Sequence, residues 1–421
     1  MLTRLPYSLL WLLVLPLALL RLLWRARRQP AYLKHVGERL GRYRVRAPGP
    51  VIWVHAVSVG ETRAAEPLVR ALLERWPEHS VVMTHMTPTG RETSKALFGS
   101  ESRVLRVYLP YDLNCLVRRF LRHFRPAFGV IMETELWPNL LAACRRRKIP
   151  VMLANARLSE RSARRYARLP ALTGLTMRAL AAIGAQTAAD AARLSGLGAE
   201  RVSITGNIKF DIAPPPAAQA LATRFRERFG ARQVLLAAST REGEEGPLLD
   251  AFARLAPPDV LLALVPRHPQ RFDEVAELVR TRGLALQRRS EEGPVADTTR
   301  VWLGDSMGEM FAYYAAADAA LIGGSWLPLG GQNLIEACAV GTPVVVGPHT
   351  FNFQVVAEQA IAAGAARRAG DIEDGVTQAL ALLRDAEARG AMASAGRKFA
   401  EAHRGATQRS IELLQRLKPA S

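Results

Sequence analysis

The stretch ALIGGSWLPLGGQNLIEA, residues 320–337, passes from an apolar strand through a glycine-rich loop into an amphipathic helix. Glycine lets the backbone come close to a ligand at angles that other residues resist. A helix that opens near residues 332–333 would point N–H groups and its dipole at an anion, and Glu336 could accept hydrogen bonds from ribose hydroxyls. The stretch therefore predicts an α/β fold with a loop that holds a nucleotide phosphate. The alternative is that the glycines merely turn a loop and that Glu336 is solvated.

The composition is that of a globular chain with a strong positive charge. The chain has 421 residues, of which 49% are hydrophobic and 23% charged, so it can form two domains with large cores. Its formal net charge of +19 predicts an anionic partner: a membrane surface, a phosphorylated substrate or a nucleic acid. Nucleic acid is the least favoured, because no aromatic interleaving or nucleic-acid module accompanies the arginines. The three cysteines form no CxxC pair, which favours a reducing, cytoplasmic setting.

The N-terminal segment predicts a membrane anchor. Residues 5–20 are uncharged and rich in leucine, and four arginines follow them. The run is shorter than the roughly 20 residues that span a bilayer, although a snorkelling Arg21 extends it to Trp24. The arginines place the rest of the chain on the cytoplasmic face of the inner membrane. A helix that lies on the surface is the alternative, and we expect the protein to fold without residues 1–28.

Strand and helix patterns alternate after this segment, which predicts parallel sheets with crossover helices. Strands are expected near residues 51–56, 80–85, 103–109, 128–132, 151–154, 182–185, 202–205, 234–238, 260–265, 300–303, 319–322 and 343–346. The proline-rich sequence DIAPPPAA separates two sets of strands. The expected parts are an anchor (1–28), an N-terminal Rossmann-like acceptor domain (29–212), a linker (213–230), a C-terminal Rossmann-like nucleotide-binding domain (231–392) and C-terminal helices (393–421).

Motifs that follow strands of the first domain are candidates for a site, because open α/β sheets bind ligands at the carboxyl ends of their strands. HAVSVGE ends in Glu61, a candidate general base if burial brings its pKa toward neutrality. METELWPN carries Glu133 and Glu135, one of which could start a helix while the other is functional. In GNIKFD, Lys209 could neutralise a carboxylate or phosphate. The structural alternatives are a first-turn acid for Glu61 and a surface lysine paired with Asp211 for Lys209.

Motifs of the second domain suit a nucleotide. VPRHPQR presents Arg267, whose planar fork binds two phosphate oxygens. GDSMGEM enters a helix at about residues 307–309 and supplies backbone N–H groups for a base or a phosphate, and STREGEE and GPHTFNF fit the same rim as loops. His268 and His349 lack an HxxxH or carboxylate pairing and no DxD triplet occurs, so we expect no metal.

Together these motifs resemble the Kdo transferases, the 3-deoxy-D-manno-octulosonic acid transferases of lipopolysaccharide assembly in Gram-negative bacteria. The resemblance covers nearly the whole chain and rests on HAVSVGE, MTPTGRE, VYLPYD, METELWPN, ANARLSERS, GNIKFD, STREGEE, VPRHPQRF, GDSMGEM, GGQNLIEA and GPHTFNF. It implies a GT-B glycosyltransferase fold, with two Rossmann-like domains facing a cleft, an N-terminal membrane anchor helix and no metal. It also implies CMP-Kdo as the donor, bound by the C-terminal domain, and a lipid A precursor (lipid IVA) as the acceptor.

The resemblance also assigns roles to residues. Glu61 matches the family's catalytic base, and Glu133 and Lys209 match residues that stabilise the transition state. The positions that match CMP-binding residues are Pro266, Arg267, Met307, Gly308, Glu309, Asn333, Leu334, Ile335 and Glu336. Some relatives carry GGHN where this chain has GGQN, a difference that leaves Asn333 in place.

These assignments predict an inverting transfer. Glu61 would deprotonate an acceptor hydroxyl, which attacks the anomeric carbon of Kdo on the face opposite CMP. Arg267 and helix N-termini would offset the charge on the departing CMP, and Lys209 would offset the sugar carboxylate. The alternatives are a GT-B enzyme with another nucleotide-sugar donor and a catalytically inactive, membrane-tethered nucleotide-binding module. The number of Kdo residues added, the acyl and phosphate pattern of the acceptor and the oligomeric state stay open.

Overall fold

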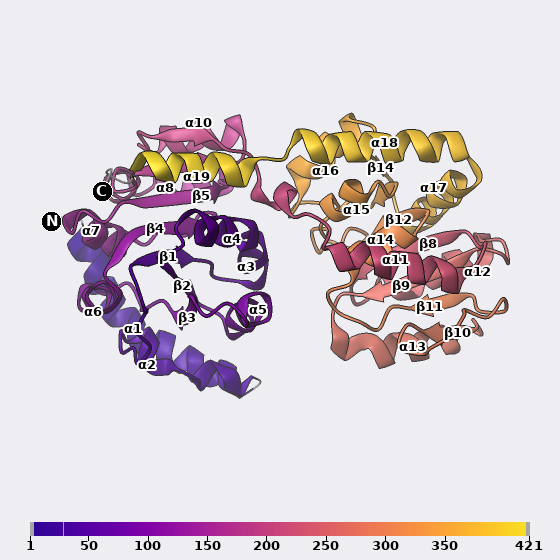
Figure 1. The fold of residues 1–421 in the computed structure, drawn as a ribbon, viewed down its shortest axis with the longest axis horizontal. Helices are drawn as coiled ribbons and strands as arrows, with labels where there is room; N and C mark the ends of the chain where they lie inside the picture. Colours follow the sequence, from indigo (N-terminus) through magenta and orange to yellow (C-terminus); the bar gives the residue numbers. More distant parts are fainter. Residues whose placement is uncertain (1–3, 28, 418–421) are drawn as a thin grey trace. The chain divides into compact units, whose positions relative to one another are not determined.

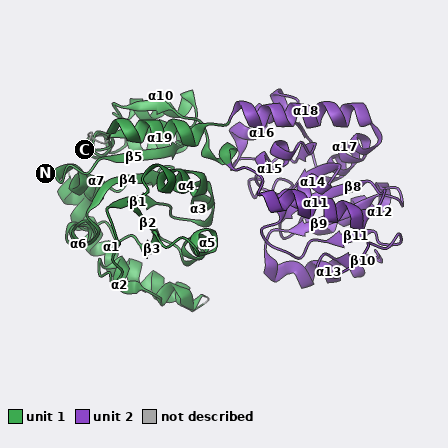
Figure 2. Cartoon of the chain, viewed as in Figure 1, with its two compact units in different colours: residues 1–211, 404–421 green, residues 212–403 purple. Residues whose placement is uncertain are grey.

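The computed structural model describes residues 4–27 and 29–417 (Figure 1). The chain divides into two compact units, unit 1 with Met1–Asp211 and Arg404–Ser421, and unit 2 with Ile212–His403 (Figure 2). Each unit contains a seven-stranded sheet, and all of the strand pairs in the described part of the chain are parallel. The predicted class, α/β with two parallel-sheet domains, is confirmed.

The sheet of unit 1 has the strand order β3-β2-β1-β4-β5-β6-β7. Its strands are β1 (Val51–His55), β2 (Ser80–His85), β3 (Val104–Tyr108), β4 (Pro126–Met132), β5 (Val151–Ala156), β6 (Ala182–Ala185) and β7 (Val202–Ile204). Its α-helices are α1 (Leu5–Ala26), α2 (Val36–Arg39), α3 (Val59–Ala64), α4 (Glu66–Arg75), α5 (Pro88–Phe98), α6 (Asn114–Phe124), α7 (Pro138–Arg146), α8 (Glu160–Ala167), α9 (Pro170–Met177), α10 (Ala188–Gly196) and α19 (Ala406–Leu417). Successive side chains of a strand point to opposite faces, so Trp53 joins one apolar cluster while Ile52 and Val54 join the other.

The sheet of unit 2 has the strand order β10-β11-β9-β8-β12-β13-β14. Its strands are β8 (Val234–Thr240), β9 (Leu261–Pro266), β10 (Leu286–Arg288), β11 (Val301–Leu303), β12 (Ala319–Ile322), β13 (Val344–Val346) and β14 (Ala366–Arg368). Its α-helices are α11 (Pro216–Phe229), α12 (Glu245–Leu255), α13 (Phe272–Arg280), α14 (Met310–Ala316), α15 (Ile335–Val340), α16 (Gln354–Ala362), α17 (Ile372–Arg384) and α18 (Ala386–Ala402). An aromatic cluster of Phe225, Phe229, Trp302 and Tyr313 joins α11 to α14 and β11.

The predicted strands are all present, with ends that differ by one or two residues. Two strands, β10 and β14, were not predicted. Both lie at edges of the sheet of unit 2, are three residues long and include arginine. An edge strand has one neighbour and often carries charge, so it lacks the continuous apolar run that reveals a central strand.

Residues 216–229, which the sequence analysis placed in a linker, form helix α11 of unit 2. Pro216 starts the helix, and Ala222, Phe225 and Phe229 are buried in it. The prolines that suggested a linker therefore mark only the approach to the helix and its first turn.

The C-terminal segment is divided between the units. Helix α18 belongs to unit 2, whereas α19 belongs to unit 1 (Figure 2). Ile411 and Leu414 of α19 are buried in the core of unit 1, and the Asp211 carboxylate accepts hydrogen bonds from the Gly405 and Thr407 N–H groups. The last helix thus completes the first unit.

The N-terminal segment forms the long helix α1, which is apolar enough to be a candidate for crossing a membrane. One side of it packs on unit 1, where its apolar contacts are Trp11, Leu15, Ala18 and Leu19 against Tyr111, Leu113 and Leu116. The segment that we expected the protein to fold without therefore contributes apolar contacts to unit 1. The run of leucines in the sequence did not show which side of the helix faces the protein.

Candidate active site

Glu61 lies in the first turn of α3, after the loop that leaves β1. The Ser58 hydroxyl donates to Glu61 Oε1 over 2.9 Å, and the Val57 N–H donates to Oε2 over 2.8 Å. Burial raises the pKa of Glu61 to about 7, and the carboxylates of Glu133 and Glu135 add to the rise, while the two hydrogen bonds oppose it. Glu61 therefore forms the hydrogen bonds of a capping residue in the first turn of a helix, and it also has a pKa suited to a general base.

Glu133 and Lys209 come together from distant parts of the sequence. Lys209 Nζ lies 3.6 Å from Glu133 Oε1. Glu133 follows β4 with φ +57°, and its N–H donates to the Ala154 carbonyl over 2.9 Å. A left-handed backbone is costly for a residue with a side chain, so the surrounding loops must hold it in place. Lys209 thus forms an ion pair with Glu133, and the Asp211 carboxylate accepts hydrogen bonds from backbone N–H groups at the start of α19.

Asn155, at the end of β5, connects this strand to the turn that carries Lys209. Its side chain is fully buried, and its Oδ1 accepts a hydrogen bond from the Ile208 N–H over 3.1 Å. Ile208 begins the short turn that carries Lys209. Asn155 also has φ +54°, a conformation in which asparagine is enriched. Asn155 was not among the predicted site residues, although ANARLSERS places it at a strand end.

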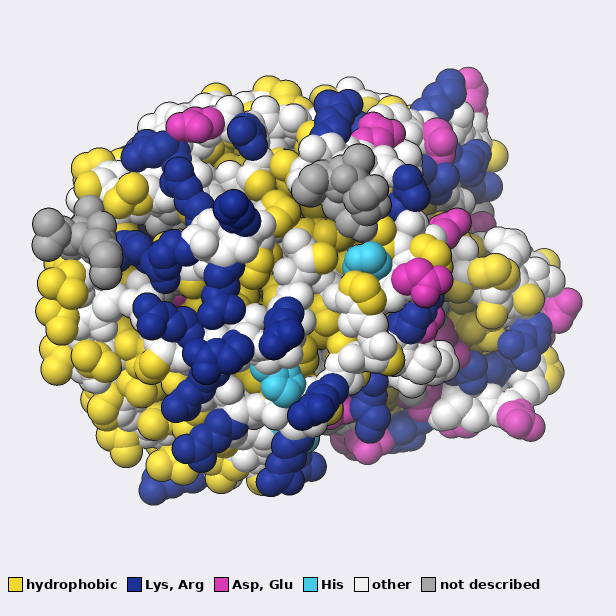
Figure 3. Space-filling view, turned by 60° about the vertical axis from the view of Figure 1, so that its left-hand side comes forward, with side chains coloured by type: hydrophobic (Ala, Val, Ile, Leu, Met, Phe, Trp, Pro, Cys, Tyr) yellow, Lys and Arg dark blue, Asp and Glu magenta, His cyan; other side chains and the backbone are white. Residues whose placement is uncertain are grey.

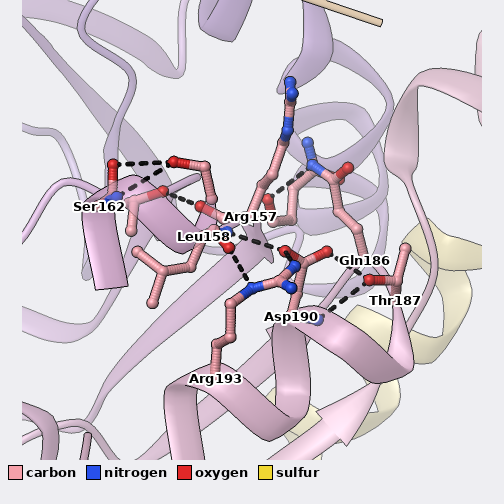
Figure 4. A network of polar contacts seen from close by, with 10 residues as sticks. Arg157, Leu158, Ser162, Gln186, Thr187, Asp190 and Arg193 are labelled. Carbon is pink, nitrogen blue, oxygen red and sulfur yellow. Dashed lines mark hydrogen bonds and ion pairs between the residues drawn. The ribbon is translucent and has the colours of Figure 1, made fainter. Parts of the chain in front are cut away.

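The rest of the loop after β5 is held by α10 (Figure 4). Asp190 accepts a hydrogen bond from the Leu158 N–H over 2.9 Å and pairs with Arg193 at 3.0 Å. The Thr187 hydroxyl donates to the second Asp190 oxygen over 2.6 Å. These contacts fix the backbone of the loop at the same edge of the sheet as Glu61 and Glu133.

A small cavity in unit 2 brings together five of the residues assigned to CMP. It is lined by Ser239, Val265, Pro266, Arg267, Ser306, Met307, Gly308, Glu309, Met310 and Tyr313. The Glu309 carboxylate is held by Arg289 through two hydrogen bonds of 2.9 Å and by the Ser306 hydroxyl. Because that carboxylate is engaged, the 307–309 turn offers a ligand mainly its backbone, and Gly308 supplies the φ of +83° that the turn requires.

Part of the glycine-rich loop that we predicted to hold a phosphate is engaged by the protein itself. Buried Glu244 accepts hydrogen bonds from the Gly324 N–H over 2.7 Å and from the Trp326 N–H over 3.1 Å. The Gly331 N–H donates to the Gly324 carbonyl over 2.7 Å. These three N–H groups are therefore engaged within the protein and are unavailable to an anion. Glu244 lies in STREGEE, whose position after a strand was the only sign of it in the sequence.

Helix α15 begins at Ile335, two or three residues after the predicted opening near 332–333, so Asn333 and Leu334 precede it. Asn333 Oδ1 accepts a hydrogen bond from the Ile335 N–H over 3.0 Å, and Asn333 Nδ2 donates to Glu336 Oε1 over 3.2 Å. Leu334 and Ile335 are each 1% exposed, so their side chains belong to the core. These four residues do not line the small cavity, and of their side chains Asn333 and Glu336 are the ones suited to a polar ligand.

Comparison with known proteins agrees with this arrangement. Residues 34–212 match the family model for 3-deoxy-D-manno-octulosonic-acid transferase (kdotransferase), and residues 248–399 match the model for glycosyl transferases group 1. The chain is 48% identical over 392 residues to a 3-deoxy-D-manno-octulosonic acid transferase of Bordetella pertussis, with 90% of each chain covered. It is 38% identical over 423 residues to the enzyme of that name from Haemophilus influenzae, with 98% of each chain covered.

A solved structure shows the same fold at low identity. The UDP-GlcNAc 2-epimerase from Neisseria meningitidis, bound to UDP-GlcNAc, is 17% identical to this chain with a TM-score of 0.59. The match covers 87% of this chain and 100% of that chain. At this identity the match concerns the fold alone.

Proposed function

The chain belongs to the 3-deoxy-D-manno-octulosonic acid transferase family and is a glycosyltransferase with a GT-B-like fold, and from this we propose that it transfers Kdo from CMP-Kdo to a lipid A precursor. The reaction would invert the anomeric configuration of Kdo and release CMP. The acceptor, the stereochemistry and the catalytic roles below are parts of this proposal.

The raised pKa of Glu61 is the observation that carries the proposed mechanism. A pKa of about 7 lets the carboxylate accept a proton from an acceptor hydroxyl near neutral pH. The deprotonated hydroxyl then attacks the anomeric carbon of Kdo, and the bond to CMP breaks on the opposite face. Lys209 Nζ lies 3.6 Å from Glu133 Oε1, and we assign its ammonium group the role of offsetting the negative charge of the sugar carboxylate.

The donor side of the proposal rests on the cavity in unit 2. Arg267 follows β9 and lines this cavity with the 307–309 turn. We assign the turn to the cytosine base and Arg267 to the phosphate, since a guanidinium can form two charge-assisted hydrogen bonds to phosphate oxygens. Asn333 and Glu336 are assigned to the ribose. We expect no metal in the reaction, and equal rates with and without EDTA would support that expectation.

We place the protein on the cytoplasmic face of the inner membrane, held there by α1. The 22-residue helix is apolar by composition, and the net charge of +19 favours an anionic surface. Both features suit an enzyme whose acceptor is an anionic lipid and whose donor is a soluble nucleotide sugar.

One assay tests the reaction. Purified full-length protein is incubated in detergent with CMP-Kdo and a tetra-acylated lipid A precursor, and lipid products are measured by mass spectrometry. We expect products heavier by one or more Kdo units, with one CMP released for each Kdo transferred. Transfer from a UDP-sugar instead would show that the donor assignment is wrong, and binding of CMP without transfer to any acceptor would indicate an inactive module.

A further inference from the structure

Helix α1 has two different faces. The leucines that point away from unit 1 are between 52% and 73% exposed, namely Leu5, Leu9, Leu10, Leu12, Leu13, Leu17, Leu20 and Leu23. The opposite face packs on Tyr111, Leu113 and Leu116 of unit 1. A helix of 22 residues is about 33 Å long, enough to cross a bilayer of about 30 Å, so length does not decide between spanning the membrane and lying on it.

Polar contacts on the face of α1 that packs on unit 1 favour a helix that lies on the membrane. The Tyr7 hydroxyl donates to Asp112 Oδ2 over 2.9 Å, and the Ser8 hydroxyl donates to Asn139 Oδ1 over 3.2 Å. Asp112 is fully buried and also accepts hydrogen bonds from the Asn139 and Leu140 N–H groups at the start of α7. If α1 crossed the membrane away from unit 1, Asp112 would lose a partner and the apolar inner face would lose its packing.

Basic groups surround the N-terminal end of α1. Arg4 precedes the helix, Arg118 lies on α6, and Arg146 and Arg147 lie at the end of α7. Partial desolvation lowers the pKa of Arg146, and the positive charges of Arg4, Arg118 and Arg147 lower it further. Figure 3 shows hydrophobic side chains along one edge of unit 1 and many Lys and Arg side chains on the adjoining face. Exposed leucines beside clustered cations fit an anionic phospholipid surface.

We propose that α1 lies in the plane of an anionic membrane as a built-in part of unit 1, with its leucine face in the lipid and its inner face bound to the start of α7. This inference rests on the proposed location at the cytoplasmic face of the inner membrane. The N-terminus and the two units would then be on the same side of the bilayer, whereas a spanning helix would put the N-terminus on the other side.

Topology can be tested with the full chain carrying different epitope tags at its two ends. In inverted inner-membrane vesicles we expect protease to remove both tags without detergent. Protection of the N-terminal tag alone would overturn the in-plane helix. Protection of the C-terminal tag would instead overturn the proposed cytoplasmic location, so the two failures are distinguishable.

Two sets of variants test the two faces. Tyr7→Phe removes a hydrogen bond to a buried carboxylate, and we expect the melting temperature to fall by about 2–4 °C. Tyr32→Phe is the control and should change it little, because the Tyr32 hydroxyl accepts a longer, solvent-exposed hydrogen bond from Arg25. Arg118→Gln with Arg146→Gln should weaken binding to phosphatidylglycerol vesicles by roughly 25-fold, at about fivefold per charge, and leave binding to neutral vesicles unchanged. An unchanged melting temperature for Tyr7→Phe, or unchanged vesicle binding for the arginine pair, would contradict the proposal.

Discussion

Glu61 combines a structural and a proposed chemical role in one side chain. Glu61→Gln retains the size of the side chain and a helix-compatible residue but cannot accept a proton. We expect turnover to fall by about 10²–10⁴-fold, the range typical of a lost general base, while the affinity for CMP stays within about threefold. Initial rates and calorimetry on one preparation measure both. A variant with near wild-type turnover would remove Glu61 from the catalytic role.

The Glu61 carboxyl should also make the stability of the protein depend on pH. Its folded pKa of about 7 exceeds its ordinary value of 4.5, so between these pH values the native state keeps a proton that the unfolded state has lost. Wild-type stability should therefore fall as pH rises from about 4.5 to about 7, and the Gln variant should lack this decline. Melting temperatures across pH 4–8 measure it, and parallel curves for the two proteins would contradict the raised pKa.

Replacing Arg267 tests the proposed CMP-binding site. Arg267→Ala should weaken CMP binding by about 1.5–3 kcal/mol, or roughly 10- to 150-fold, because a charge-assisted contact to phosphate is lost. Arg280→Ala is a matched control, since Arg280 is a largely exposed arginine of α13 that does not line the cavity. Calorimetry with CMP decides, and wild-type affinity in Arg267→Ala would place the phosphate elsewhere.

Single residues were predictable where chemistry and position agreed. Glu61 and Lys209 are ionisable residues in the segments that follow β1 and β7. The charge of Glu133 contributes to the raised pKa of Glu61, and Glu133 pairs with Lys209. Glu244 was missed because its partners, the Gly324 and Trp326 N–H groups, belong to a distant loop. A carboxylate that satisfies backbone donors within the protein has the same sequence pattern as one that binds a ligand.

Among the elements, the loop after β12 depends on close backbone packing. A Cβ on Gly323 would lie 2.4 Å from the Ser239 carbonyl oxygen, so Gly323→Ala forces backbone of two neighbouring strands apart. We expect a loss of about 1–3 kcal/mol in the free energy of unfolding. Gly196→Ala is the control, since a Cβ there meets nothing within 4 Å. Urea unfolding compares them, and equal midpoints would mean that the loop adapts.

Elements were predictable in proportion to their burial. Central strands such as β1 and β12 are buried along their whole length and mostly apolar, so their limits were found to within one or two residues. Helix α11 was mistaken for a linker because prolines precede it, and the environment that buries Phe225 and Phe229 comes from β11 and α14, far along the chain. Local sequence signals cannot report such contacts.

For the whole molecule, α19 is the element that links the two ends of the chain in one core. Leu414→Ala should cost about 2–5 kcal/mol, since it leaves a cavity beside buried residues of unit 1. Glu412→Ala is a matched change on the exposed side of α19. Hydrogen exchange should show reduced protection in the strands of unit 1 for Leu414→Ala alone. Loss of protection confined to unit 2 would contradict the assignment of α19 to the first unit.

The return of α19 to unit 1 also determines the order in which the protein can mature on the ribosome. Residues up to Asp211 emerge first, yet their core stays open until the final helix has been synthesised. Unit 2 is continuous in sequence from Ile212 to His403, so its core needs no segment that is synthesised later. The first half to be translated is therefore the last to be completed, and a nascent chain that stops near residue 404 would expose the apolar surface of unit 1 to chaperones and proteases.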